Sequence, residues 1–186
     1  MQTVDSIIYA RWVVPVTASQ QVLENHAVII KDSRIVALLP QEEAKHQFSA
    51  QTIHDMSRHC LIPGLINNHT HSAMSLFRGL ADDLPLMTWL NEHIWPAEKQ
   101  FVSDQFVESG SALAIAEMLR GGTTCFNDMY FFPEATARVA DKSGIRVSLG
   151  MIVIELPTNW ANSVDEYLHK GQQLHDHYRH HPRIST

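Results

Sequence analysis

Residues 61–72 read Leu-Ile-Pro-Gly-Leu-Ile-Asn-Asn-His-Thr-His-Ser, and this stretch decides how the rest of the chain is interpreted. An apolar run leads into His69 and His71. In an extended strand alternate side chains leave from the same face, so the two imidazoles would project together. Paired imidazoles are ligands that Zn²⁺ and similar divalent metals accept. The segment therefore predicts a strand that ends in a metal-binding pair, and Pro63 and Gly64 set how the chain enters that strand.

The composition is that of an ordinary globular protein. The chain has 186 residues, is 45% hydrophobic and 18% charged, and its net charge of −6 argues against a nucleic-acid-binding surface. Two cysteines, Cys60 and Cys125, are too few for a disulfide framework and are expected to be reduced thiols of a cytoplasmic protein. No signal peptide is evident at the N-terminus, and no apolar stretch reaches the roughly 20 residues that a bilayer span needs. We therefore expect neither nucleic acid nor membrane as a partner.

Residues 1–60 are expected to form part of a small β-sandwich domain. The short β-rich segments alternate with polar turns and lie at residues 7–14, 28–30, 34–39 and 53–56. A brief helix is predicted near residues 42–44, and Lys31-Asp32-Ser33 has the composition of a hairpin turn. Regular short strands of this kind favour a sandwich over a barrel unit.

Residues 61–186 show strands that alternate with helices. The predicted strands are 61–67, 123–126, 145–154 and 183–186, and the predicted helices are 84–95, 103–120, 133–143 and 163–178. Ser103 and Ser163 are the expected N-caps of two of these helices, and Pro96 is expected to end the first helix. The alternation indicates a parallel sheet, and a metal pair at the carboxyl end of a strand fits a TIM (β/α)8 barrel. Because a complete barrel needs about 250 residues, only the first three β/α units and the start of a fourth strand fit here, and the barrel is incomplete.

Four stretches of the chain resemble a known family, and the fourth ends in Trp-Pro-Ala-Glu, residues 95–98. They are residues 63–71, 76–86, 89–90 and 94–98. Together they resemble the amidohydrolase superfamily, within the branch of aminohydrolases and chlorohydrolases that act on purines and triazines. The resemblance runs along the whole chain and is densest between Leu61 and Glu98. It implies a distorted TIM barrel with a small β-sandwich that is assembled from both ends of a longer chain.

The resemblance also implies a metal-dependent enzyme. It makes His69 and His71 ligands of Zn²⁺, or of iron or another divalent metal, together with ligands from later strands. The implied reaction is hydrolytic deamination of adenosine derivatives such as 5-methylthioadenosine and S-adenosylhomocysteine, in which metal-activated water attacks adenine C6 and ammonia leaves. The catalytic acid and base are expected beyond Thr186, so no catalytic residue is assigned in this chain. A homo-oligomer is implied for the full-length protein.

Glu98 is the candidate substrate-binding residue. The resemblance assigns it to the ribose hydroxyls of a nucleoside substrate, and a carboxylate suits a diol because charge-assisted hydrogen bonds are about twice as strong as neutral ones. Without the motif, a solvated glutamate beside Lys99 would be the simpler interpretation. Some family members carry an Arg near the end of the third strand, where this chain has Ser148-Leu149-Gly150. That difference weakens the case for S-adenosylhomocysteine relative to 5-methylthioadenosine.

Two alternative functions stay open at this point. The first is a sibling amidohydrolase that acts on guanine, a triazine or another heteroaromatic amine or chloride. The second is a catalytically incomplete fragment that turns over no substrate by itself.

Other polar and aromatic residues receive structural interpretations. Asp128, after the second strand, is expected to orient a metal ligand rather than to bind metal. An apolar pocket lined by Trp89 and Trp95 is one interpretation, but their helical spacing favours packing in the core. The histidine-rich segment 175–181 is followed by Pro182, so we expect a solvated helix end there rather than a second metal site.

Overall fold

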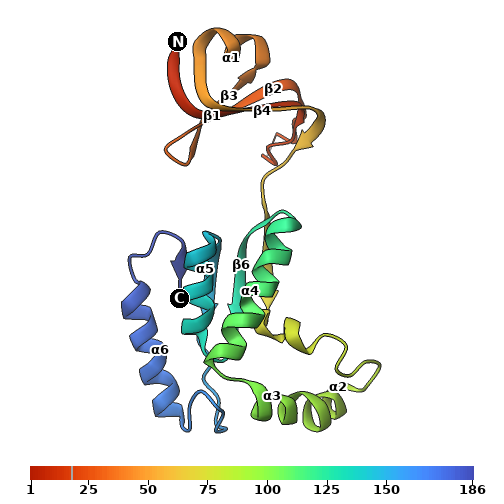
Figure 1. The fold of residues 1–186 in the computed structure, drawn as a ribbon, viewed down its shortest axis with the longest axis vertical. Coiled ribbons are helices and arrows are strands. Elements are labelled where there is room, and N and C mark those ends of the chain that lie inside the picture. Colours follow the sequence, from red (N-terminus) through yellow and green to blue (C-terminus); the bar gives the residue numbers. More distant parts are fainter. Residues whose placement is uncertain (18) are drawn as a thin grey trace. The chain divides into compact units, whose positions relative to one another are not determined.

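The computed structural model describes residues 1–17 and 19–186, which divide into two compact units, Met1–Pro63 and Gly64–Thr186 (Figure 1). Each unit contains its own four-stranded sheet, and neither sheet closes into a barrel. Among the helices in these described residues, none has the length and apolar character needed to cross a bilayer.

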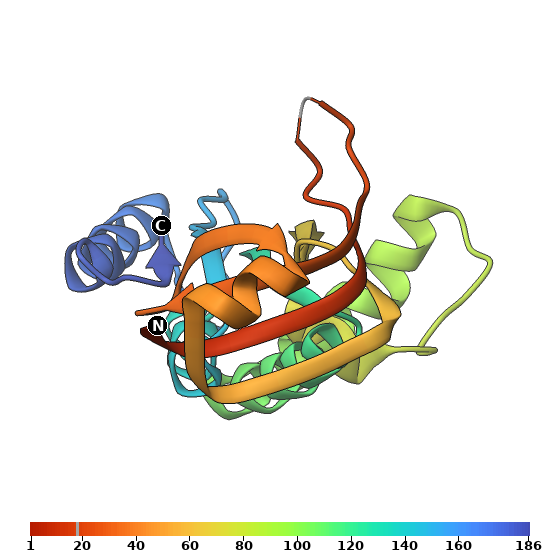
Figure 2. The ribbon, with the colours of Figure 1, turned by 90° about the horizontal axis from the view of Figure 1, so that it is seen from above.

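The first unit is a mixed sheet with the strand order β3-β2-β1-β4. Its elements are β1 (Gln2–Val13), β2 (Leu23–Lys31), β3 (Arg34–Pro40), α1 (Gln41–Gln47) and β4 (Phe48–Leu61). Strand β1 pairs antiparallel with β2 and parallel with β4. Figure 2 shows α1 against this sheet, where Ala44 joins a core with Val4, Ile7, Ala27 and Ile29. The strands expected from the sequence are present, and the assignment of this sheet to a β-sandwich stays a prediction.

The predicted hairpin joins β2 to β3. Asp32 and Ser33 both have positive φ angles, 51° and 60°, which is the conformation of a two-residue type I′ turn. The side chain of Asp5 supports this turn, because its Oδ2 accepts the Asp32 N–H at 2.7 Å.

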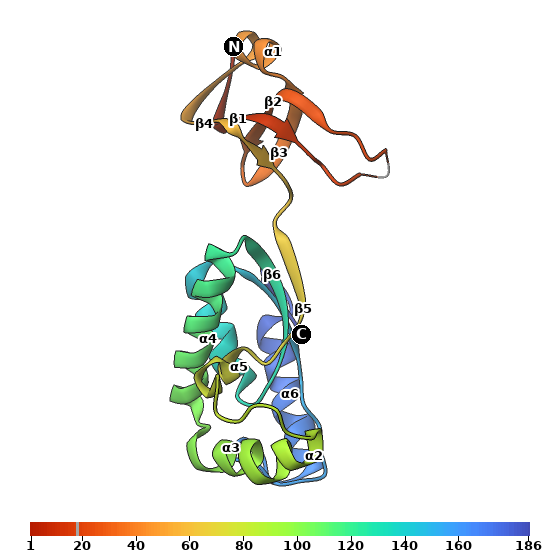
Figure 3. The same cartoon turned by 90° about the vertical axis from the view of Figure 1, so that its right-hand side faces the viewer.

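The second unit is a parallel sheet whose strands lie side by side in chain order. The strands are β5 (Leu65–Thr70), β6 (Thr123–Met129), β7 (Arg146–Gly150) and β8 (Ile184–Ser185). The long helices between them are α4 (Asp104–Arg120), α5 (Pro133–Ser143) and α6 (Val164–Tyr178), and Figure 3 shows α4 alongside β6. The predicted strand–helix alternation is confirmed, and its open sheet has the order of consecutive strands of a TIM barrel.

Short polar signals set the ends of the helices. The Oγ of Ser103 accepts the N–H of Phe106 and starts α4, and the Oγ of Ser163 accepts the N–H of Glu166 and starts α6. Helix α5 ends at Gly144, whose φ of 78° suits a residue without a Cβ. These caps were expected from the sequence and are confirmed.

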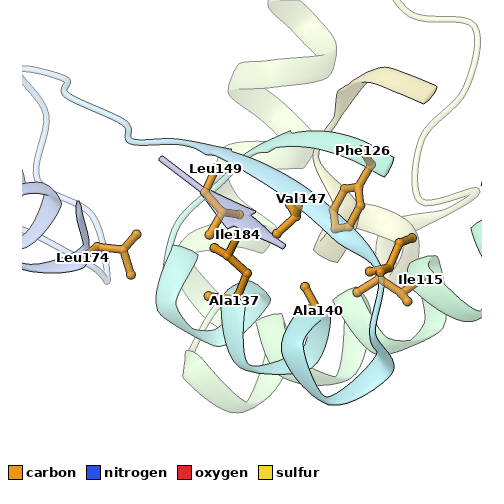
Figure 4. Packing of buried hydrophobic residues seen from close by; sticks show 9 residues of the cluster. Ile115, Phe126, Ala137, Ala140, Val147, Leu149, Leu174 and Ile184 are labelled. Atoms are coloured by element: carbon orange, nitrogen blue, oxygen red, sulfur yellow. The ribbon is translucent and has the colours of Figure 1, made fainter. Parts of the chain in front are cut away.

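The helices cover one face of the parallel sheet. Figure 4 shows side chains of β6, β7 and β8 packed against those of α4, α5 and α6 in one core, formed by Ile115, Phe126, Ala137, Ala140, Ile145, Val147, Leu149, Leu174 and Ile184. Outside this core, Leu65, Ile66 and Met129 of β5 and β6 keep large exposed fractions of 52%, 65% and 43%.

The predicted C-terminal end of the helix over residues 84–95 is wrong. The structure has α2 (Leu86–Thr88), a π-helical turn η2 (Trp89–Ile94) and α3 (Trp95–Phe101), so the helix continues past Pro96. A proline ring clashes with the carbonyl four residues earlier in a regular helix. The wider π-helical turn precedes Pro96, which then lies in the first turn of α3, where its missing N–H costs nothing.

The third strand is shorter than predicted. Strand β7 ends at Gly150, although the apolar sequence continues to Ile154. Pairing with β6 stops at Gly150, and β8 pairs only with Val147 and Ser148. The apolar residues that follow leave the sheet, and Ile152 and Ile154 pack near Trp160 instead.

Residues 1–186 expressed alone are expected to self-associate. The outer edge of β5 has no neighbouring strand in the described sheet, and Leu65 and Ile66 beside it are largely exposed. Unpaired edges and apolar patches favour intermolecular pairing. Size-exclusion chromatography with light scattering checks this, and replacing both residues with Lys is expected to reduce the association. A monodisperse, cooperatively unfolding monomer would contradict the prediction.

Candidate metal and substrate site

The structure brings His69 and His71 together at the carboxyl edge of the parallel sheet. His69 is the fifth residue of β5, and His71 directly follows the strand and begins the 3-10 turn η1 (Ser72–Phe77). Their ring centroids are 5.3 Å apart. The carboxyl edge is also the face on which TIM-barrel enzymes carry their active sites.

A hydrogen bond sets the tautomer of His71. Its Nδ1 lies 2.6 Å from the carbonyl oxygen of Met129 at the end of β6. A carbonyl only accepts, so Nδ1 must donate, and a neutral ring then keeps the lone pair of Nε2 for a metal. This arrangement of a ligating imidazole is the usual one in metal sites. The two histidines therefore fit a divalent metal as two of its ligands.

The described residues supply only part of a metal site. Within residues 1–17 and 19–186 no group of three or more His, Cys, Asp or Glu side chains is arranged to hold a metal. Catalytic zinc usually has three protein ligands and one water. Further ligands would have to join His69 and His71 from outside this set.

Asp128 ties the chain around His71 to β6. Its carboxylate is 1% exposed and accepts three hydrogen bonds, from Thr70 Oγ1 at 2.8 Å, Ser72 N at 2.7 Å and Ser72 Oγ at 2.8 Å. Thr70 and Ser72 flank His71, so the carboxylate holds the residues on both sides of that histidine, through the Thr70 side chain and through both the backbone and the side chain of Ser72. These contacts agree with the interpretation of Asp128 as a ligand-orienting residue.

Glu98 projects from α3 and is half-buried. The hydroxyl of Tyr130, the residue after β6, donates to Glu98 Oε1 at 2.7 Å. Burial raises the pKa of Glu98, and the hydrogen bond from Tyr130 opposes that rise. Burial and the charge of Glu98 raise the pKa of Tyr130 far above its usual value, so the phenol stays protonated. The ring of Tyr130 also lies 6.3 Å from that of His71, which places Glu98 near the histidine pair.

Glu98 lines a cavity of about 700 Å³. The cavity has mainly apolar walls, formed by Trp95, Glu98, Lys99, Val102, Phe131, Ile154, Leu156, Pro157, Thr158 and Asn159. Trp95 is 44% exposed, so the expectation that it packs in the core is wrong. It lines the cavity as a residue of the first turn of α3. Tyr130 was missed in the sequence, although its position directly after a strand of the parallel sheet was an available signal.

The histidine-rich segment 175–181 lies at the end of α6, which stops at Tyr178. His175 Nδ1 is 2.7 Å from Thr186 Oγ1, and His181 Nε2 is 3.1 Å from Asp141 Oδ1. These histidines therefore contact different partners rather than one another.

Comparisons with known proteins extend these observations. Residues 60–184 match the model of the amidohydrolase family. The chain is 50% identical over 175 residues to a 5-methylthioadenosine/S-adenosylhomocysteine deaminase of Saccharophagus degradans, covering 94% of this chain and 39% of that protein. A relative of the same name from Teredinibacter turnerae is 45% identical and covers 99% and 42%. The chain thus spans about two fifths of the length of these curated relatives.

Solved structures show the same relationship. A zinc-bound adenosine deaminase from Xanthomonas campestris has a TM-score of 0.98 and 47% identity, covering all of this chain and 42% of its own. An atrazine chlorohydrolase from Arthrobacter aurescens has a TM-score of 0.85 at 19% identity, covers 97% of this chain and 45% of its own, and shows the common fold alone. With the family model covering two thirds of its length, this chain belongs to the amidohydrolase family.

Proposed function

We propose that this chain forms part of a metal-dependent enzyme that deaminates adenosine derivatives, with 5-methylthioadenosine favoured over S-adenosylhomocysteine. Residues 1–60 would contribute to a β-sandwich domain. Residues 61–186 would form the first three β/α units of the barrel and begin its fourth strand. The remaining ligands and the catalytic acid and base would come from the rest of a longer polypeptide.

One observation carries this proposal. The imidazoles of His69 and His71 lie together at the carboxyl edge of a parallel sheet, with Nδ1 of His71 already donating to Met129. The deaminase names of relatives at up to 50% identity and the zinc in the Xanthomonas campestris structure support the chemistry. The carboxylate of Glu98, beside a largely apolar cavity, supports a substrate that has hydroxyl groups next to an apolar group.

The residues of this chain have distinct tasks in the proposed reaction. His69 and His71 hold the metal, which when bound supplies an activated water for attack on the adenine ring. Asp128 and Met129 keep His71 in position. Glu98 accepts hydrogen bonds from ribose hydroxyls and so orients the nucleoside, which raises the effective concentration of the reacting carbon at the metal.

The direct test is ammonia release by the full-length protein from four substrates: 5-methylthioadenosine, S-adenosylhomocysteine, adenosine and guanine. Metal content is measured on the same samples, and residues 1–186 alone serve as the inactive control. Turnover of the adenosine derivatives by the full-length protein is the expected result. Turnover of guanine alone, or none despite bound metal, would overturn the proposed substrate.

Glu98→Gln is expected to lower kcat/KM on 5-methylthioadenosine by about 10- to 100-fold, because it removes a charge-assisted acceptor from the ribose hydroxyls. Activity on any ribose-free base that the enzyme accepts should change far less. Glu92→Gln, on the exposed side of η2, is the matched control and should leave both activities unchanged. Equal losses with and without ribose would remove Glu98 from sugar binding.

A further inference from the structure

We propose that Tyr130 is a positioning residue for Glu98, and that Asn159 fixes the helix on which Glu98 is carried. The two side chains would hold one carboxylate oxygen toward the cavity, where it can accept hydroxyl hydrogens of a nucleoside. This inference rests on the substrate-binding role proposed for Glu98.

The first support is the contact between the two side chains. Tyr130 is 4% exposed, and its hydroxyl donates to Glu98 Oε1 at 2.7 Å. An ionised carboxylate has about four acceptor positions, so one bond to Oε1 leaves Oε2 free to bind a ligand. Glu98 also lines the cavity, so the residue that Tyr130 contacts borders the open space.

The second support is the rigidity of Tyr130 itself. Its ring belongs to a buried cluster with Ala73, Val102, Val107 and Ala135 and stacks at a tilt against Phe131, with centroids 5.2 Å apart. The preceding residue, Met129, accepts the hydrogen bond from His71. A phenol held in this way has little rotamer freedom to lose when substrate binds, which is how preorganisation improves affinity.

The third support lies at the C-terminal end of α3, the helix that carries Glu98. Asn159, in the loop between β7 and α6, points its Nδ2 at the carbonyl oxygens of Val102 at 2.8 Å, Lys99 at 3.1 Å and Glu98 at 3.4 Å. The carbonyl oxygen of Glu98 already accepts the N–H of Val102, whereas those of Lys99 and Val102 lie at the end of the helix, so the amide acts there as a C-terminal cap. Helix α3 ends at Phe101, so this cap holds the last turn of the helix that carries Glu98.

Together these contacts determine the direction of Glu98 from two neighbouring strands. Tyr130 follows β6 and orients the side chain, whereas Asn159 follows β7 and orients the backbone. The rings of Tyr130 and His71 have centroids 6.3 Å apart, so Tyr130 also holds the carboxylate of Glu98 near the histidine pair. Removing the phenol oxygen should therefore disturb ribose binding without removing a metal ligand.

The experiment measures binding of product nucleoside, so that no turnover interferes. Isothermal titration calorimetry on the full-length protein compares inosine with hypoxanthine, which lacks the ribose. Tyr130→Phe is expected to weaken the binding of inosine about 10-fold and to leave the binding of hypoxanthine unchanged. The only bond lost is the one from the phenol to the charged carboxylate of Glu98. In the Glu98→Gln background the same change should have almost no further effect, because coupled residues are not additive. Tyr178→Phe, on α6, is the control.

Kinetics supply a second measurement on the same variants. Tyr130→Phe should raise KM for 5-methylthioadenosine about 10-fold and change kcat less than about 2-fold. Asn159→Ala should move KM in the same direction. Equal weakening of inosine and hypoxanthine, or full additivity with Glu98→Gln, would overturn the positioning role while the proposed function stands. Failure of the unaltered protein to bind any nucleoside would overturn both.

Discussion

Replacing His71 with Asn is expected to reduce the metal affinity of the full-length protein by more than about 100-fold and to abolish the proposed deamination. Mutation of a residue that only orients a metal ligand typically lowers metal affinity 10- to 100-fold. Loss of a ligand itself should lower it further. The Nε2 lone pair of His71 is available because Nδ1 donates to Met129, and Asn has no nitrogen lone pair to replace it. Elemental analysis of purified protein and competition with a chelator measure the change.

The matched control is His180→Asn, which alters an exposed histidine beyond the end of α6. It should leave metal content and turnover at the level of the unaltered protein. His69→Asn should resemble His71→Asn, because both imidazoles lie on the same edge of the sheet. Full metal occupancy in either variant would show that the metal is held elsewhere.

Asp128→Ala is expected to lower the free energy of unfolding of the second unit, Gly64–Thr186, by about 3 kcal/mol, through the loss of hydrogen bonds to a charged group. The change leaves the buried N–H of Ser72 without its partner and removes the acceptor of two hydroxyl groups. Metal affinity should also fall by about 10-fold or more, because the residues on both sides of His71 are released. Denaturant unfolding and chelator competition, both on the full-length protein, measure the two effects.

A graded series separates these effects. Asp128→Asn keeps one carbonyl oxygen for the Ser72 N–H and should recover about half of the lost stability. Asp82→Asn, at an exposed position before α2, should change stability by less than about 0.5 kcal/mol. Stability lost without any change in metal affinity at a temperature where the variant is folded would limit Asp128 to a structural role.

Local signals in the sequence predicted the elements of the second unit. Ser103 and Ser163 start helices because their hydroxyls reach N–H groups three residues later, and Gly144 ends one because it accepts a positive φ. The pairing of His69 with His71 follows from the two-residue period of a strand. Each of these relations joins residues within a few positions of one another, so the sequence contains all the information needed.

Predictions failed where the outcome depended on neighbours distant in the chain. Strand β7 stops at Gly150, whose partner Met129 is the last residue of β6, and the apolar sequence of β7 itself does not reveal this end. Pro96 does not end its helix, because a π-helical turn accommodates it. Trp95 lies in the wall of a cavity that residues far along the chain help to form, rather than in the expected core position.

The sequence by itself determined the family resemblance, the strand–helix rhythm and the identity of the histidine pair. The tertiary structure alone decided what holds those groups in place. Tyr130 meets Glu98 from 32 residues away, and Asp128 meets Ser72 from 56 residues away. Contacts of this range arise when parallel strands bring their carboxyl ends to one edge of a sheet, and no local pattern of residues encodes which side chains will meet there.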